Sequence, residues 1–342
     1  MSDLIKVNEC DVEDAYANAD QKAIFRKMLT QEKLKRDPKT GKLLRPWNFE
    51  VVNGFFKQSD PSTDDSTFDL LEENFGLALD SWSSLKKKLK SLNDGKQPNE
   101  SYKLIICARH GQGYHNRAVE IFGIEEWNRY WSHQTGTTLE NGQVLEWGPD
   151  PLLTELGERQ ADELHQAWLS QIEDGAPIPT KFFTSPFTRS SMTLVRTWRD
   201  ITIFENGDIK KPSFSSRAHP IVSENLRETI GSHLCDKRSS KKVISERFSK
   251  FGFEFESNFA EEDIYYRDDW RETLSEQSLR ADMFLQDVFE NHPDDIYISS
   301  TSHAGEIRAI ITALGHREFA IPTAGTIPFV VKGTRVSNSP PS

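Results

Sequence analysis

The sequence is poor in cysteine and contains no long apolar run. Only three of its 342 residues are cysteines, and Cys10, Cys107 and Cys235 are widely spaced. An odd and scattered set of this kind builds neither a disulfide framework nor a zinc site, and it suits a reducing compartment. No stretch approaches the ~20 consecutive apolar residues of a membrane helix, and the first residues lack the apolar centre of a signal peptide. We therefore expect no secretion and no membrane partner, and a cytoplasmic or also nuclear location.

Positive charge is also in deficit. The chain has 42 lysines and arginines against 53 aspartates and glutamates, which gives a formal net charge of −11 at pH 7. A field of this sign repels polyanions, so nucleic acid is not an expected partner. A small anionic substrate remains compatible with this composition, because a local cluster of arginines outweighs more distant charge.

Residues 1–100 differ in character from the rest of the chain. Helical spacing of apolar residues predicts helices over 14–32 and 82–92, with charged, turn-rich stretches between them. Phe55, Phe56 and Phe68 look like buried anchors, but so few apolar side chains do not make an independent core. We expect residues 1–100 to be an extension that packs on a catalytic domain of residues 101–335, with residues 336–342 as a disordered tail.

From residue 102 onward, short apolar runs alternate with helical patterns. The expected strands cover 104–108, 181–184, 296–300 and 326–332, and a further strand ends near 221–222. The expected helices cover 154–172, 186–198 and 305–314. Ser185 followed by Pro186 predicts a helix cap with proline in the first helical position. Strands that alternate with helices predict an α/β fold, a three-layer αβα sandwich around a mostly parallel sheet.

Charged and imidazole side chains follow three of these strands. Arg109 and His110 come directly after the first, Arg189 a few residues after the second, and His303 after the strand at 296–300. Reactive side chains gather at the strand ends of open α/β sheets. Two arginines and two histidines at that edge can surround a tetrahedral dianion, because arginine donates forked hydrogen bonds to phosphate oxygens.

Four motifs occur in a fixed order over residues 102–332, each at a strand end or a helix start: Arg109-His110-Gly111 with Asn116, Leu153-Thr154 through Gln160-Ala161, Ser185-Pro186 through Arg189-Ser190, and Ser302-His303-Ala304-Gly305. Together they resemble the histidine phosphatase superfamily, in its phosphoglycerate mutase-like branch. Two segments are similar to the fungal and plant phosphomutase-like members of that branch. They are Arg109 through Asn116, and Asn225 through Glu228 with Gly231, His233 and Cys235 through Arg238. Gly54 through Gln58 is similar to a segment of the N-terminal extension in the fungal members.

The resemblance implies a covalent mechanism that needs no metal. His110 is the implied nucleophile, and the implied ligands of the phosphoryl oxygens are Arg109, Asn116, Arg189 and His303. A phosphohistidine intermediate divides one difficult displacement into two easier ones. The arginines and histidines already supply positive charge to the transferring group, so no metal and no other cofactor is expected.

The implied proton donor to the leaving group is Glu228, and Glu224, one turn earlier, is an alternative. His115 either lines the pocket or orients its loop. His233, Cys235 and Asp236 resemble a metal cluster, but a second pair of ligands is missing, so we expect them to be a packing element of a loop.

The expected activity is that of a phosphatase acting on a small phosphorylated metabolite. A phosphoglycerate mutase-type transfer is an alternative, but only Arg117, Arg129 and Arg227 stand out as further basic residues for a second phosphate and a carboxylate. A third hypothesis is a binding protein that keeps the fold without turnover. The retained arginines and histidines argue against it. Gly113 stands where many members of the family have threonine or serine, which leaves the substrate open, and no signal in the sequence specifies an oligomeric state.

Overall fold

The protein is built around a seven-stranded sheet, and the computed structural model describes residues 4–18, 20–207 and 217–336. The order of the strands across the sheet is β1-β9-β2-β8-β5-β6-β7. Strands β2, β8, β5, β6 and β7 are parallel, whereas β9 runs antiparallel to both β2 and β1. The bounds are β1 Trp47–Val51, β2 Glu100–Arg109, β5 Lys181–Thr184, β6 Ile221–Val222, β7 Glu254–Phe255, β8 Tyr297–Ser302 and β9 Thr326–Arg335.

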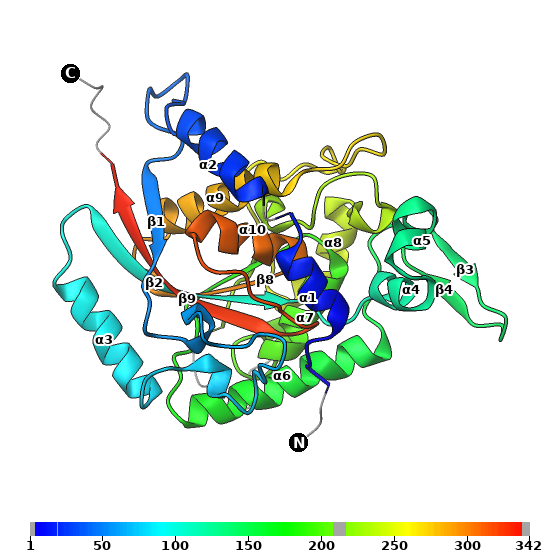
Figure 1. Ribbon diagram of the computed structural model, residues 1–342, viewed down its shortest axis with the longest axis horizontal. Coiled ribbons are helices and arrows are strands. Elements are labelled where there is room, and N and C mark those ends of the chain that lie inside the picture. Colours follow the sequence, from blue (N-terminus) through cyan, green and yellow to red (C-terminus); the bar gives the residue numbers. More distant parts are fainter. Residues whose placement is uncertain (1–3, 19, 208–216, 337–342) are drawn as a thin grey trace.

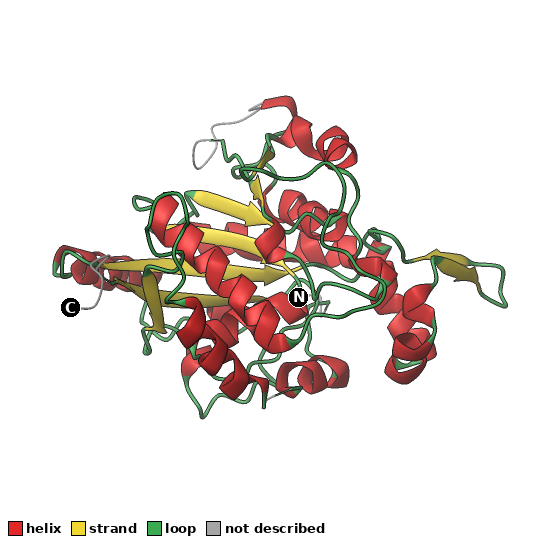
Figure 2. Cartoon of the chain, turned by 90° about the horizontal axis from the view of Figure 1, so that it is seen from above, coloured by secondary structure: helices red, strands yellow, loops and turns green. Residues whose placement is uncertain are grey.

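Helices cover both faces of this sheet (Figures 1 and 2). Side chains of β2 alternate between the two layers, as the period of a strand requires. Leu104 and Ile106 share one core with α3, α6 and α7, while Ile105 and Cys107 share the other with α9 and α10. The predicted three-layer αβα sandwich with a mostly parallel sheet is therefore confirmed. These helices are α3 Trp82–Asp94, α6 Glu155–Glu173, α7 Thr188–Trp198, α9 Leu274–Asn291 and α10 Ala304–Leu314.

The remaining elements lie around the central sheet and its covering helices. Helix α1 packs on α10 and α2 packs on α9, whereas α4, α5 and the β3–β4 hairpin project together from one end of the molecule (Figures 1 and 2). Buried Trp127 and Trp147 hold that projection together. The elements are α1 Glu9–Tyr16, α2 Gln21–Glu32, α4 Tyr114–Phe122, α5 Ile124–Arg129, β3 Gly136–Thr138, β4 Val144–Glu146 and α8 Lys241–Phe248. Among the described helices, none combines the length and apolar character needed to cross a bilayer.

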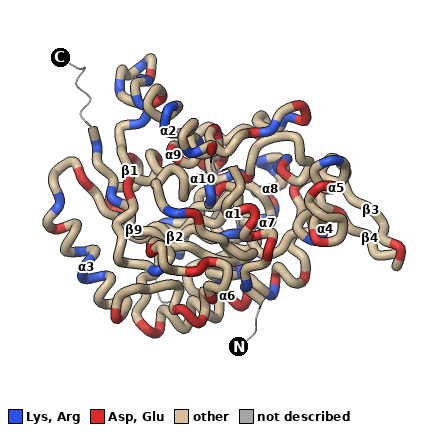
Figure 3. The backbone as a smooth tube through the Cα atoms, in the orientation of Figure 1, with Lys and Arg blue, Asp and Glu red and all other residues tan. Residues whose placement is uncertain are grey.

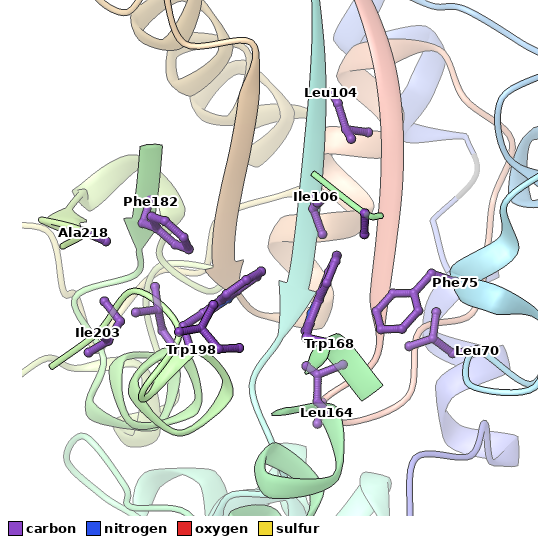
Figure 4. Packing of buried hydrophobic residues seen from close by; sticks show 14 of the residues in the cluster. Leu70, Phe75, Leu104, Ile106, Leu164, Trp168, Phe182, Trp198, Ile203 and Ala218 are labelled. Atoms are coloured by element: carbon purple, nitrogen blue, oxygen red, sulfur yellow. The ribbon is translucent and has the colours of Figure 1, made fainter. Parts of the chain in front are cut away.

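Residues before 100 contribute directly to the sheet and its core. Strand β1 pairs with β9, and Phe55 and Phe56 are buried, while Phe68 is half-buried. Leu70 and Phe75 lie beside Trp168 of α6, with the rings of Phe75 and Trp168 4.6 Å apart (Figure 4). The expected tail, residues 336–342, lies outside the described residues except for its first residue.

Two expected helices differ from those observed. The helix expected over 14–32 is two helices, because Ala17 is extended and Asn18 has a φ of +61°, so the helical path breaks there. The helix after β5 begins at Thr188 rather than at Pro186. The prediction that Ser185 caps this helix is wrong, since the residue at the N-cap position is Phe187. The hydroxyl of Ser185 lies 2.7 Å from Nε2 of His303 and accepts the N–H of Phe187 at 3.4 Å.

Candidate active site

His110 lies directly after β2, in the middle of the sheet. Its backbone N–H donates to the carbonyl of Ser302 and its carbonyl accepts from the N–H of Ala324, both at 3.0 Å. The imidazole is 2% exposed, and its Nδ1 lies 2.6 Å from the carbonyl oxygen of Gly111. A carbonyl oxygen can only accept, so Nδ1 carries the proton and Nε2 keeps its lone pair. This is the tautomer in which Nε2 can act as a nucleophile.

Three imidazoles meet at this point, and we call His110, His115 and His303 the imidazole cluster. The ring of His110 lies 5.0 Å from that of His303 and 5.3 Å from that of His115. Burial, followed by the positive charge of Arg189, holds the pKa of each ring well below its usual value. All three imidazoles are therefore neutral at pH 7 in the free protein.

Arg109 and Arg189 flank the imidazole cluster, and an aspartate holds each of them. Nη1 of Arg109 donates to Oδ1 of Asp11 and to the carbonyl of Ile321, both at 2.6 Å. Arg189 is fully buried and donates to Oδ1 of Asp236 at 3.1 Å and to the carbonyl of Cys235 at 3.0 Å. Both guanidinium groups are thus fixed in place by contacts on one side.

Several nitrogen atoms of this group have no partner in the described part of the chain. They are buried and comprise Nε of Arg109, Nε of Arg189, Nδ1 of His115 and Nδ1 of His303. Buried polar atoms in folded proteins are nearly always hydrogen-bonded. Four such atoms around one neutral imidazole suit an anion with several oxygen atoms.

A cavity of about 460 Å³ opens at this group and is lined by α1, α4, α5 and the start of α10. Arg109, His115, Asn116 and Glu228 line it, and His110, Arg189 and His303 are buried next to them. The side-chain oxygen of Asn116 accepts the N–H of Gly113 at 2.9 Å, so it also fixes the loop. All six residues expected at the site are therefore brought together.

Gly113 makes room for one member of the imidazole cluster. A Cβ at this position would lie 2.7 Å from the ring of His115. A Cβ in a folded protein essentially never lies within 3.0 Å of another side chain, so a threonine or serine here would displace that ring. His115 itself lines the cavity, which favours the first of the two roles left open for it.

The two glutamates weighed as proton donor lie in different surroundings. Glu228 lines the cavity, where its Oε1 accepts the N–H of Thr229 at 2.9 Å and its Oε2 the N–H of Gly305 at 3.4 Å. Glu224 is buried elsewhere and accepts from Arg238 at 2.8 Å and from Arg227 at 3.0 Å. Glu228 therefore belongs to the candidate site, and Glu224 is a buried ion-pair partner.

The basic residues beside the site are not those that the sequence singled out. Arg117 and Arg129 form ion pairs on the surface, and Arg227 is buried in an ion-pair network. Arg271 and Arg308 line the cavity instead. Arg308 lies one turn into the helix that follows the Ser-His motif, which was a usable signal, whereas Arg271 lies in a loop without any motif.

His233, Cys235 and Asp236 place one ligand atom each within 4.8 Å of one another. Asp236 already accepts from Arg189 at 3.1 Å and from Arg271 at 3.3 Å. Burial raises the pKa of the Cys235 thiol well above its ordinary value, so it stays protonated. Two guanidinium groups on the carboxylate and a neutral thiol do not suit a cation, which favours the packing interpretation.

These features describe an αβα protein with a buried, histidine-centred candidate site. The chain is 32% identical over 308 residues to a "Probable phosphoglycerate mutase" from Arthroderma benhamiae, covering 86% of this chain and 87% of that protein. It is 36% identical over 280 residues to "Phosphomutase-like protein 3" from Candida albicans, covering 81% and 78%. The chain therefore belongs to the histidine phosphatase superfamily, in its phosphoglycerate mutase-like branch, and the resemblance of the motifs is confirmed.

No protein-family model matches the chain. Among solved structures, the ecdysone phosphate phosphatase from Bombix mori is similar with a TM-score of 0.41 and 15% identity, covering 70% of this chain and 94% of that one.

Proposed function

We propose that the protein is a phosphatase that hydrolyses a small phosphorylated compound through a phosphohistidine on His110. One observation carries this proposal: a neutral imidazole whose Nδ1 holds the proton lies among buried nitrogen atoms of arginine and histidine that have no partner among the described residues. Such a group matches a tetrahedral oxyanion placed in line with a nucleophile.

The proposed reaction proceeds in two displacements. Nε2 of His110 attacks phosphorus while the bond to the leaving oxygen breaks, and Glu228 gives that oxygen its proton. Water then attacks phosphorus, Glu228 takes the proton of the water, and the bond to Nε2 breaks to release phosphate. Arg109, Arg189 and His303 stabilise the charge of the transferring group in both steps.

The proposed reaction uses no divalent metal and no other cofactor. The guanidinium groups supply the positive charge that a metal would otherwise provide, and a neutral imidazole can still donate a hydrogen bond. We also propose that residues 1–100 are an extension of this catalytic domain, and that the protein acts in the cytoplasm or also in the nucleus.

Hydrolysis of p-nitrophenyl phosphate tests the proposal. The wild-type protein should release phosphate, and His110→Ala should abolish release while leaving the unfolding midpoint nearly unchanged. Rapid quenching during turnover should trap an acid-labile, base-stable phosphoryl label on the wild type only. A label on serine, or undiminished turnover by His110→Ala, would contradict the mechanism, and a wild type without any turnover would favour a binding protein.

A mutase-type transfer is the second candidate, because Arg271 and Arg308 line the same cavity. Both are engaged, since Arg308 pairs with Asp14 at 2.8 Å and Arg271 with Asp236 at 3.3 Å, so hydrolysis remains the first candidate. Incubation with a phosphoglycerate, followed by phosphorus NMR, separates the two. Isomerised phosphoglycerate would indicate transfer, and inorganic phosphate would indicate hydrolysis.

A further inference from the structure

Asp11 reaches the candidate active site from outside every sequence motif. It is the third residue of α1 and is 6% exposed. Its Oδ1 lies 2.6 Å from Nη1 of Arg109, although 98 residues separate the two in sequence. A helix near the start of the chain therefore supplies a carboxylate to a residue of the cavity wall.

The second oxygen of the same carboxylate takes part in the N-terminal cap of α1. Oδ2 of Asp11 accepts the N–H of Asn8 at 3.1 Å, while the side-chain oxygen of Asn8 accepts the N–H of Asp11 at 3.0 Å. This reciprocal pair is a capping box, which satisfies donors at the start of a helix. One buried carboxylate thus joins the start of α1 to the guanidinium of Arg109.

The contacts of Arg109 leave one part of its guanidinium unpartnered. Both hydrogen bonds that hold it go through Nη1, one to Asp11 and one to the carbonyl of Ile321, whereas Nε has no partner among the described residues. Two acceptors on one nitrogen fix the plane of the group. The unpartnered N–H is then presented in a fixed direction, from which it can donate a charge-assisted hydrogen bond to an oxyanion.

Helix α1 is itself firmly attached to the domain. It carries several acidic residues (Figure 3), and Asp14, one turn after Asp11, pairs with Arg308 of α10 at 2.8 Å. Ile5, before the helix, is buried in the main core. The position of the Asp11 carboxylate is therefore fixed by the capping box and by the packing of α1 on the domain.

We propose that Asp11 is a positioning residue, which holds Arg109 in the orientation that binds the phosphoryl group and makes α1 part of the active site. The proposal rests on the proposed function for the role of Arg109. A carboxylate beside an anion site also has an opposite effect, since its charge weakens the binding of an anion. Positioning and charge therefore predict changes of opposite sign when Asp11 is neutralised.

The test is Asp11→Asn, with tungstate as a tetrahedral dianion and p-nitrophenyl phosphate as substrate. Calorimetric titration should show tungstate binding weakened by about tenfold, because a small misplacement of a binding group has a large effect. The kcat for p-nitrophenyl phosphate should fall more than KM rises, since the contact of the arginine strengthens in the transition state. If Asp11 had only a structural role, its substitution would lower the unfolding midpoint without reducing kcat more than it raises KM.

Three matched variants separate the causes. Asn8→Ala weakens the cap but keeps the contact between Asp11 and Arg109, and Glu9→Gln makes the same charge change on an exposed residue of the same turn. Both should bind tungstate within about twofold of the wild type. In an Arg109→Lys background, Asp11→Asn should have little further effect, because the two residues act as one unit.

Unchanged or tighter binding of tungstate by Asp11→Asn would overturn the proposal, as would an equal loss in Asn8→Ala. Failure of the proposed function gives a different pattern. A wild type that binds tungstate without turnover, or with turnover that survives His110→Ala, refutes the phosphatase mechanism while the binding comparison still decides the role of Asp11. A wild type that does not bind tungstate refutes both.

Discussion

Gly305 leaves no room for a side chain beside Glu228, and this allows the proposed proton donor to be moved without removing any ionisable group. A Cβ at residue 305 would lie 2.1 Å from Oε1 of Glu228 and 3.0 Å from the hydroxyl of Thr229. The nearer atom is the end of a flexible side chain, which can rotate away. Gly305→Ala should therefore displace the carboxylate of Glu228 and little else.

The expected changes in stability and in rate are of very different size. Alanine is favoured over glycine inside a helix by about 1 kcal/mol, which offsets the cost of moving one flexible side chain, so the free energy of unfolding should change little. General acid catalysis contributes about 10²- to 10⁴-fold to a rate. An alkyl phosphate needs that proton, because an alkoxide is a poor leaving group, whereas p-nitrophenolate leaves as a stable anion.

The assay compares kcat for glycerol phosphate and p-nitrophenyl phosphate. Gly305→Ala and Glu228→Gln should both reduce turnover of the alkyl ester by about 100-fold, within the range of general acid catalysis, and that of the aryl ester much less. Gly95→Ala is the matched control, since its Cβ would meet only the carbonyl of Ser91 at 3.4 Å, at the end of α3. Equal losses for both esters, or none in either variant, would refute the role of Glu228.

The remaining predictions concern pH, buried charge and metal. The lowered pKa of His110 keeps it neutral, so the acid limb of kcat/KM should lie below the usual value of about 6.5; a limb at or above pH 7 would contradict this. Glu224→Ala should reduce the free energy of unfolding in urea by about 3 to 5 kcal/mol, because Arg227 and Arg238 lose a buried partner, and a loss below about 1 kcal/mol would contradict that role. EDTA should leave turnover unchanged. A loss of turnover that added magnesium restores would reveal a metal requirement.

The sequence predicted the central strands well, and the clearest signal was the continuous apolar run at 104–108, which lies within β2 and is buried. The strand expected over 181–184 is observed with those bounds, and the helix expected from Thr154 begins with the Thr154 side chain capping it. The start of α7 was misplaced because a tertiary contact acts on Ser185, whose hydroxyl lies 2.7 Å from Nε2 of His303 and accepts the N–H of Phe187 only at 3.4 Å. The break after α1 depends on the left-handed conformation of Asn18, which no periodic pattern encodes.

The candidate site likewise has parts that the local sequence predicts and parts that depend on tertiary packing. Arg109, His110 and His303 could be grouped from the sequence, because the carboxyl ends of neighbouring parallel strands meet at one edge of the sheet. Asp11 and Arg271 could not, because each comes from a segment whose position depends on tertiary packing alone. The motifs therefore predict which groups could meet the phosphate, and the structure adds what holds those groups in place.

The charge balance of the site makes a last prediction, which concerns protons. In the free protein Arg109 pairs with Asp11, Asp236 pairs with both Arg189 and Arg271, and the imidazole cluster is neutral. This pairing lets the guanidinium groups persist in a buried site, since a buried charge without a partner is costly. A dianion disturbs this charge balance, and its negative charge should raise the pKa of the nearby imidazoles and draw protons onto them.

Tungstate binding should therefore take up protons at neutral pH, and the affinity should fall as pH rises, since protons are bound more strongly in the complex. The dianion itself stays unprotonated at neutral pH, so any proton taken up belongs to the protein. Calorimetric titration in buffers of different ionisation enthalpy measures this uptake. His303→Asn should reduce it and Glu9→Gln should not. A binding enthalpy that is independent of the buffer would show that the imidazoles remain neutral beside the anion, and that the arginines alone balance its charge.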